Sequence, residues 1–449
     1  MPKPLTLFEH ECQTFAWTDR DLALLERLRA ATQTDVLKAT IRNGKRAIQA
    51  MQHVGVVRFG NRTIQVLPKI YQARDSSAEE IKTKEATANL LRMLAYAGEL
   101  PVREHELAPL MRQTDNWFEI LTRLFATHLR EEWQRGAHRT YQTTEDDSAV
   151  LKGKWRIPEQ LKKPECKHLF FVAYDEFSAD NRLNRVFRLV VERLWKLTRD
   201  NDNRQMLGEL REWMEEVTLV PNVTAESANP SQLTRLNERY RPLLNLARMF
   251  LDGGALQMAA GDLATFAFVF DMNQLFEKFI TGFVHRHSGE ILSDELKACD
   301  FLPQSRGAGR YLAKRDDKAV FQTKPDIAFR NGTHFPLLVD TKYKRLDERD
   351  RKLGVSQADF YQMHAYAHRY ACSRVVLLYP ETAGSSGATR ARFKLEECSH
   401  TVEVSTVNLN ANLNSKGDRQ KLIAELRTSF SQEKIDHAIQ RSSISEISR

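Results

Sequence analysis

The sequence is poor in cysteine, and its cysteines are scattered. There are five, Cys12, Cys166, Cys299, Cys372 and Cys398, an odd number without any C-x-x-C pair. This pattern argues against a disulfide framework and against a zinc site built from paired cysteines. We therefore expect reduced thiols.

Long apolar runs are also missing. No window approaches the roughly eighteen uninterrupted apolar residues that a membrane helix needs. The first residues, Met1-Pro2-Lys3-Pro4, lack the apolar run of a signal peptide. These absences predict a cytoplasmic protein that makes no use of a membrane.

A nucleotide-binding loop is absent as well. The loop that holds phosphates in many NTPases follows the pattern G-x-x-x-x-G-K-[ST]. The pairs Gly44-Lys45 and Gly153-Lys154 lack the upstream glycine. Any nucleotide hydrolysis coupled to this protein would have to come from another chain.

The composition is that of a globular protein with several domains. The chain has 449 residues, which predicts roughly three domains at about 150 residues each. Hydrophobic residues make up 42% and charged residues 28%, so the whole chain is neither disordered nor fibrous. The net charge of +8 favours a polyanionic partner, although simple solubility charge explains it equally well.

Three regions differ in their sequence pattern. Residues 1–110 are predicted to be β-rich, because two β-rich runs flank the turn signal Gly60-Asn61. From Trp117 onward apolar residues recur with the helical period, so residues 111–258 are predicted to be mostly helical. In residues 259–449 strands alternate with helices, as in an α/β domain. The predicted fold class is therefore a multidomain α+β protein.

The most informative window runs from Phe321 to Lys344. Two predicted strands flank Asn331-Gly332, a strong hairpin signal. The second strand carries an apolar run and then Asp340 and Lys342, which project from one face because side chains alternate along a strand. A carboxylate and an ammonium are therefore expected side by side at the end of a buried strand.

This arrangement suits metal-assisted cleavage of a phosphodiester. Mg²⁺ prefers oxygen ligands from one or two carboxylates and keeps several waters. Asp326, Asp340 and the backbone carbonyl of Thr341 would supply the oxygens, and Lys342 would stabilise the charge that grows on the phosphate. The alternative is a solvated Asp and Lys pair at a strand end, and a Pro-Asp turn of no functional meaning.

The hairpin register poses a difficulty for this site. With a two-residue turn at Asn331-Gly332, Asp326 would share a face with Val339 and not with Asp340. A bulge or a longer loop has to restore the register. Pro336, which cannot donate to the strand ladder, is the expected place for it.

A helix is predicted at residues 357–371, after the N-cap residue Ser356. Gln362 and Tyr366 are spaced i, i+4 on one face of it. The next apolar run, residues 374–379, is a strand, so the order is that of a parallel crossover beside the site. Without the upstream motif, Gln362 would be taken as a surface residue and Tyr366 as part of the core.

These elements resemble a known family. Pro325-Asp326, Asp340-Thr341-Lys342 and Gln362-Met-His-Ala-Tyr366 look like the P-D, (D/E)-x-K and Q-x-x-x-Y elements of the PD-(D/E)xK nuclease superfamily. The chain is more narrowly similar to the McrC family. The matching stretches are His53-Val-Gly-Val-Val, Val66-Leu-Pro-Lys-Ile70, Met272-Asn-Gln-Leu-Phe-Glu277, Leu338-Val-Asp-Thr-Lys-Tyr-Lys344 and Asp359-Phe-Tyr-Gln-Met-His-Ala-Tyr366.

The resemblance implies a nuclease subunit of a McrBC-type restriction system for 5-methylcytosine. Such a subunit cuts modified double-stranded DNA with Mg²⁺, or Mn²⁺ in its place, when a GTP-hydrolysing AAA+ ring of the McrB type drives it. We expect residues 1–110 to contact that partner and stimulate it. Two alternatives stay open, a self-sufficient nuclease of a repair or defence system and a protein that acts chiefly as a GTPase-stimulating adaptor.

The resemblance also implies a role for Glu277, which matches the helix glutamate that completes the metal site in many members of the superfamily. The helical pattern places Glu277 on the flank of an apolar face. By the pattern alone it is a surface charge. By the resemblance it is a metal ligand.

Overall fold

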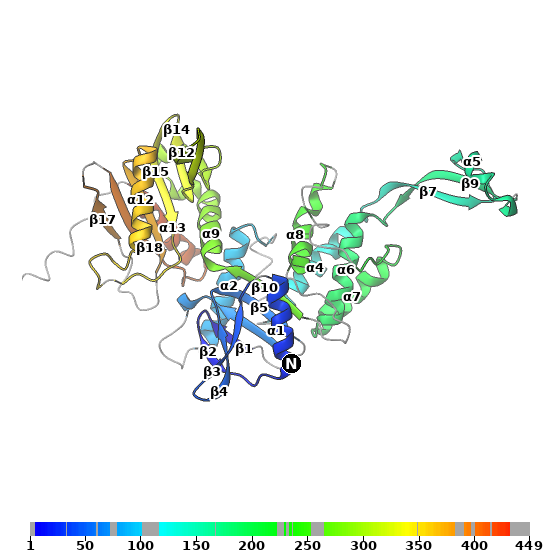
Figure 1. The fold of residues 1–449 in the computed structure, drawn as a ribbon, viewed down its shortest axis with the longest axis horizontal. Coiled ribbons are helices and arrows are strands. Elements are labelled where there is room, and N and C mark those ends of the chain that lie inside the picture. Colours follow the sequence, from blue (N-terminus) through cyan, green and yellow to red (C-terminus); the bar gives the residue numbers. More distant parts are fainter. Residues whose placement is uncertain are drawn as a thin grey trace, which may run out of the picture.

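The computed structural model describes residues 5–32, 34–59, 62–71, 79–100, 116–166, 168–221, 229, 233–235, 237–252, 265–347, 349–381, 390–396, 400–413 and 415–431. Figure 1 shows an N-terminal sheet region, a helical bundle, a long arm that projects from the bundle, and a C-terminal sheet flanked by helices.

The N-terminal region contains two sheets. The four-stranded sheet has the order β1 (Leu5–Phe8), β6 (Arg62–Leu67), β5 (His53–Phe59) and β10 (Thr265–Asp271). The antiparallel pairing of β5 with β6 confirms the predicted hairpin, whose turn at residues 60–61 lies outside the described residues. The other sheet has the order β2 (Cys12–Thr14), β4 (Lys45–Ala50) and β3 (Leu37–Arg42). The accompanying helices are α1 (Asp19–Thr32), η1 (Lys69–Tyr71) and α2 (Glu79–Tyr96).

Strand β10 comes from much later in the chain than the other three strands of the four-stranded sheet. Its Val269 pairs with Gly55, which has a φ of +139°. A Cβ at Gly55 would meet the carbonyl oxygen of Phe268 at 1.9 Å, so only glycine fits there. The predicted boundaries at residues 110 and 258 stay predictions.

The middle region is a helical bundle with an inserted arm. The bundle consists of α4 (Trp117–Gln134), α6 (Arg182–Leu197), α7 (Asn201–Trp213), η6 (Glu238–Tyr240) and α8 (Arg241–Asp252). Helix α4 confirms the helix predicted from Trp117. The arm consists of β7 (Thr140–Ser148), β8 (Lys154–Trp155), α5 (Ile157–Gln160), η3 (Pro164–Cys166) and β9 (Phe170–Ser178).

The arm adds strands to a region that is otherwise helical, as predicted. Strands β7 and β9 pair along nine residues each, and Figure 1 shows them extending away from the bundle. The sequence of β7 carries only polar residues apart from its Tyr141. A strand with solvent on both faces needs no alternation of apolar residues, so its pattern did not indicate a strand.

The C-terminal region is built on a six-stranded mixed sheet. Its order is β11 (Asp300–Pro303), β14 (Ile327–Asn331), β15 (His334–Thr341), β16 (Arg374–Pro380), β18 (Thr401–Val407) and β17 (Arg390–Lys394). The helices are α9 (Met272–Arg286), α10 (Ser288–Ile291), α11 (Asp294–Lys297), α12 (Gln357–Tyr370) and α13 (Lys416–Phe430). A separate hairpin pairs β12 (Arg310–Arg315) with β13 (Lys318–Thr323). The parallel pairing of β15 with β16 confirms the predicted crossover through α12.

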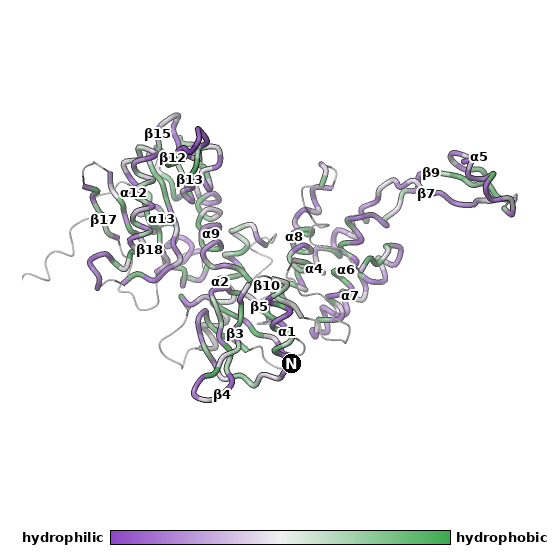
Figure 2. Tube along the Cα trace, viewed as in Figure 1, coloured by the Kyte–Doolittle hydropathy of each residue, from purple (hydrophilic) through white to green (hydrophobic). Residues whose placement is uncertain are grey.

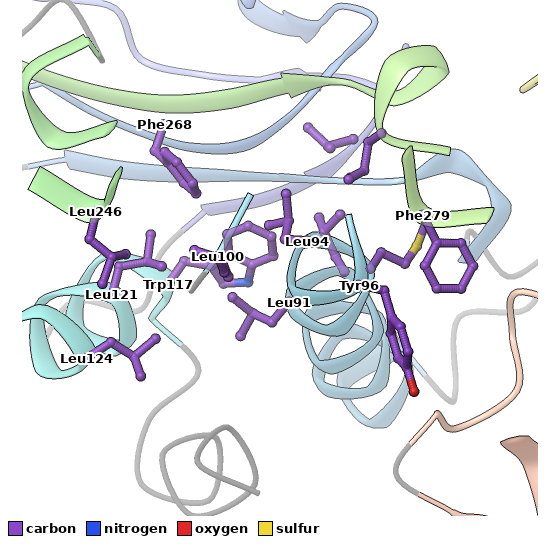
Figure 3. Close-up of a cluster of buried hydrophobic side chains, with 14 of the residues drawn as sticks. Leu91, Leu94, Tyr96, Leu100, Trp117, Leu121, Leu124, Leu246, Phe268 and Phe279 are labelled. Carbon is purple, nitrogen blue, oxygen red and sulfur yellow. The ribbon is translucent and has the colours of Figure 1, made fainter. Parts of the chain in front are cut away.

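Both faces of the six-stranded sheet are buried, which agrees with the continuous apolar runs of β15 and β16. Ile327, Val339 and Leu378 face a core that also takes in α9 and α13 and continues into the N-terminal sheet and the bundle. Figure 3 shows part of this core, where Trp117 packs among leucines, and Figure 2 shows the apolar stretches along the inner strands. Ala328 and Leu338 face the opposite core, under α12.

Two findings concern the scattered cysteines and the missing long apolar runs of the sequence. Cys12, Cys166, Cys299 and Cys372 are free thiols, as predicted, and Cys398 lies outside the described residues. Among the described helices, none is long and apolar enough to cross a membrane.

Candidate active site

The hairpin of β14 and β15 brings two aspartates opposite each other. Ile327 pairs with Val339 and Phe329 with Leu337, whereas Asn331 pairs with His334. The single β14 residue between Phe329 and Asn331 therefore lies opposite two residues of β15, Phe335 and Pro336. This is a β-bulge, and it confirms the bulge predicted at Pro336. The turn itself lies at Gly332-Thr333, one residue later than predicted. Continuing the shifted register places Asp326 opposite Asp340, on the same face.

Asp326 is fixed by the end of the neighbouring strand. Its Oδ2 accepts hydrogen bonds from the backbone N–H and from the hydroxyl of Thr341, both at 2.7 Å. Its backbone carbonyl accepts from the N–H of Gln304 at 2.7 Å. These hydrogen bonds fix the Asp326 side chain against the end of β15. The structure thus brings Thr341 to Asp326 through its N–H and hydroxyl, while the role of its carbonyl stays a prediction.

Asp340 is buried beside Lys342. Only 2% of the Asp340 side chain is exposed, and its Oδ2 lies 2.7 Å from Lys342 Nζ. The carboxylate and the ammonium therefore form an ion pair at the end of the buried strand. A buried carboxylate is costly unless it is paired, and this ammonium is its partner. The solvated-pair alternative does not fit this burial.

Gln362 and Tyr366 lie behind Lys342. Lys342 Nζ donates to Gln362 Oε1 at 3.0 Å, and Gln362 Nε2 donates to the hydroxyl of Tyr366 at 2.7 Å. Tyr366 is a buried residue of α12 itself, and this helix begins after the confirmed N-cap Ser356. Both residues therefore orient the lysine, and Gln362 is not a free surface residue.

Glu277 lies near the aspartates but does not join them in a cluster. Its Oε1 accepts from Gln304 Nε2 at 2.9 Å, and its negative charge raises the pKa of both Asp326 and Asp340. In the described part of the chain, no three Asp, Glu, His or Cys side chains are grouped so as to hold a metal ion. The two interpretations of Glu277 therefore stay open.

Burial governs the ionisation of this site. Loss of solvent raises the pKa of Asp326, and the neighbouring charges of Asp340 and Glu277 raise it further. Loss of solvent also raises the pKa of Asp340, although Lys342 opposes the shift. For Lys342 burial is the largest single effect and lowers the pKa, but the hydrogen bond to Asp340 and the charges of Asp340, Asp326 and Asp359 together outweigh it, so the net shift is upward. A bound cation would stabilise both carboxylates in their ionised form.

Sequence reasoning missed the residues that anchor the strand end beyond Lys342. The hydroxyl of Tyr343 donates to Glu9 Oε2 at 2.9 Å, and the N–H of Lys69 donates to the same oxygen at 2.9 Å. Arg345 donates to the carbonyl of Lys69 at 2.8 Å. The site strand is therefore held by the N-terminal region. No local pattern could have revealed a contact between residues this far apart in the sequence.

The residues present fit a divalent cation that prefers oxygen ligands. Asp340 offers a buried carboxylate, and Asp326 faces it across the hairpin, where the negative charge of Asp340 raises the pKa of Asp326. Mg²⁺ needs only one or two carboxylates and completes its shell with water and substrate oxygens. Two aspartates are therefore sufficient, and a third carboxylate is not required.

We expect Asp326→Asn to stabilise the metal-free protein. Because the pKa of Asp326 is raised on folding, ionisation opposes folding, and stability falls as the pH rises from the ordinary carboxyl range through the raised pKa. At pH values above the ordinary carboxyl range, removing this charge should increase the free energy of unfolding by on the order of 1–3 kcal/mol, since one pKa unit is about 1.4 kcal/mol. Thermal melts in EDTA across pH measure this, with the exposed Asp146→Asn as control. An equal melting temperature for Asp326→Asn and wild type at high pH would contradict it.

Comparison with known proteins identifies the family. A family model for the McrBC 5-methylcytosine restriction system component matches residues 48–380, well over half of the chain. The chain belongs to this McrBC family. No curated protein matches this McrBC-family chain in sequence.

Solved structures agree with the fold. A refined half-complex from a tetradecameric assembly of Thermococcus gammatolerans McrB AAA+ hexamers with bound McrC contains a chain that is 24% identical. The match covers 95% of this chain and 99% of that one, with a TM-score of 0.70. The fold of this McrBC-family chain is therefore that of the solved chain. A cryo-EM structure of the Thermococcus gammatolerans McrBC complex matches at 27% identity over 64% of this chain and 88% of that one, with a TM-score of 0.49.

Proposed function

We propose that this chain is the Mg²⁺-dependent endonuclease subunit of a restriction system that cuts modified double-stranded DNA. One observation carries the proposal. Asp326 and Asp340 face each other across a bulged hairpin, with Lys342 at 2.7 Å from Asp340. Membership of the McrBC family supports the restriction context. The C-terminal α/β sheet with α12 across it supports a PD-(D/E)xK nuclease domain.

Each residue of the site has a proposed role. Asp326 and Asp340 would hold the cation, with the Thr341 carbonyl and Glu277 as further oxygen ligands. When bound, Mg²⁺ supplies a positive charge that polarises the phosphate and lowers the pKa of water. Lys342 stabilises negative charge that develops on the phosphate. Gln362 and Tyr366 hold the lysine in line through the hydrogen bonds described above.

We infer that GTP hydrolysis resides on a McrB-like AAA+ ring. This chain has no phosphate-binding loop, and the solved assembly that shares its fold is described as McrB AAA+ hexamers with bound McrC. A partner of the same class would supply the GTPase, and this chain would stimulate it. The proposed compartment is the cytoplasm.

The test is reconstitution with an AAA+ GTPase of the McrB type. Methylated duplex DNA should be cut only when this chain, the partner, GTP and Mg²⁺ are all present. Cutting by this chain with Mg²⁺ alone would favour the self-sufficient nuclease. GTPase stimulation without any cutting, in Mg²⁺ or in Mn²⁺, would favour the adaptor.

The arm is a second proposed docking surface beside residues 1–110. It exposes several large apolar side chains, Tyr141, Val150, Leu151, Trp155, Ile157, Leu161 and Phe177, whereas the N-terminal sheets expose Ile41. Exposed apolar groups of this kind mark interaction sites. Deleting residues 1–110 would strip β5 from β10, so point variants are the sharper test.

We expect Val150→Asp with Leu161→Asp to lower stimulation of the partner's GTP turnover by about tenfold or more, since each change places a charge in an apolar contact. Ile41→Asp tests the N-terminal region in the same assay and should have a smaller effect, because fewer apolar groups surround it. A circular dichroism spectrum controls for folding. Full stimulation by the double variant would exclude the arm.

A further inference from the structure

The hairpin of β12 and β13 has solvent on both faces. Of its residues, only Thr323 is buried. Between Arg306 and Lys324 the sequence places six basic and two acidic side chains, and the hairpin tip is among the strongly hydrophilic stretches in Figure 2. Among the described residues, neither Lys314 nor Lys318 has an ion-pair partner, and Arg315 reaches only its neighbour Asp316 at 3.7 Å. The tip thus carries three basic side chains beside two acidic ones, and neither lysine is paired with an acid among the described residues.

Apolar side chains stand among these cations. Phe321 is 73% exposed and Leu312 is 52% exposed. The ladder pairs Tyr311 with Gln322 and Ala313 with Val320 but leaves out Leu312 and Phe321. Phe321 has a φ of +60°, a conformation that costs energy for a bulky residue. The exposed Phe321 ring adds little buried apolar area to the folded protein, and its backbone conformation costs energy. Together these two facts point to a binding role.

The base of the hairpin is firmly attached next to the candidate site. The hydroxyl of Thr323 lies 3.1 Å from that of Tyr370 in α12, and Arg310 stacks over the ring of Tyr370. Arg369 donates to the carbonyl of Tyr311 at 2.7 Å. Thr323 precedes Asp326 by three residues, so the strand runs directly into the site. The base of the hairpin is thus held against α12 and leads directly to Asp326.

We propose that the β12–β13 hairpin is a DNA-contacting element of this protein, in which Lys314, Arg315 and Lys318 bind backbone phosphates and Phe321 and Leu312 pack against the sugars and base edges. The inference rests on the proposed nuclease function and names the element that holds its substrate. Charge complementarity favours a nucleic acid over a protein partner, because basic side chains outnumber acidic ones by four to two in residues 310–323 and by six to two over residues 306–324. Aromatic groups among cations are the usual composition of such surfaces.

The test is binding of the full chain to a fluorescent DNA duplex in EDTA, so that no cleavage occurs. We expect the triple variant Lys314→Gln, Arg315→Gln, Lys318→Gln to bind about tenfold or more weakly at 0.1 M salt. The slope of log affinity against log salt should fall by about three, near one per lost phosphate contact. The matched control removes three exposed lysines elsewhere, by Lys38→Gln, Lys45→Gln and Lys394→Gln, and should keep the slope.

Phe321→Gly separates binding from folding. Glycine tolerates the positive φ, so the melting temperature should not fall, while loss of the ring should weaken DNA binding by about fivefold or more. Triple-variant binding equal to that of the control would overturn the proposal. So would wild-type DNA binding combined with lost stimulation of the partner, which would make the hairpin a protein contact. If the wild type binds DNA in EDTA yet never cuts it with Mg²⁺ and the partner, the proposed function fails while the hairpin result stands.

Discussion

Replacing Asp340 with alanine is expected to abolish DNA cleavage, by roughly a thousandfold or more, and to leave stimulation of the partner's GTP hydrolysis intact. The side chain is 2% exposed and lies opposite Asp326 across the hairpin, so its loss removes a central carboxylate of the proposed cation site. A cation stabilises the transition state by several kcal/mol, and each 1.4 kcal/mol is about tenfold in rate. Single-turnover cleavage of methylated DNA and a parallel GTPase assay measure the two activities.

Two further variants make the result of Asp340→Ala interpretable. Asp340→Asn keeps the shape of the side chain and should be equally inactive, which separates loss of charge from a folding defect. Asp294→Ala removes a fully exposed carboxylate and should cut at the wild-type rate. Cleavage by Asp340→Asn within tenfold of wild type would refute the site. Loss of GTPase stimulation together with cleavage would mean that Asp340 holds the fold and not the metal.

Lys342→Ala is expected to lower the cleavage rate by on the order of a hundredfold or more, the scale for removing one electrostatic stabiliser. DNA binding and Mg²⁺ binding should stay nearly intact. The ammonium lies between Asp340 Oδ2 at 2.7 Å and Gln362 Oε1 at 3.0 Å, so its position is set from both sides. Lys342→Arg keeps the charge but places a bulky planar group in a site that holds a compact one, and it should also be impaired.

The measurement is single-turnover cleavage at saturating Mg²⁺ with the partner and GTP, beside a binding assay at matched salt because phosphate contacts are salt-dependent. Lys297→Ala, at an exposed lysine in α11, is the control for loss of one charge. Wild-type cleavage by Lys342→Ala would remove the lysine from the mechanism. The carboxylates alone would then have to account for catalysis.

Local patterns in the sequence were enough to predict the elements that carry the site. The paired runs of β5 and β6, the hairpin of β14 and β15 and the helix α12 with its N-cap Ser356 are all predicted by turn signals, periodicity and capping. The bulge at Pro336 was predictable too, because only a shifted register lets Asp326 share a face with Asp340. These features depend on neighbours within a few residues along the chain.

The sequence by itself determined which polar residues end the buried strand β15, and only the tertiary structure decided what they contact. Lys342 meets Gln362 because α12 crosses the sheet, and Tyr343 meets Glu9 because the N-terminal region packs against that strand end. The arm of β7 and β9 and the entry of β10 into the first sheet depend on pairing between distant segments. The hydrophobic period and the composition of a segment carry no information on such pairing. Long-range contacts are fixed by packing and strand register, and not by residues close to one another in the sequence.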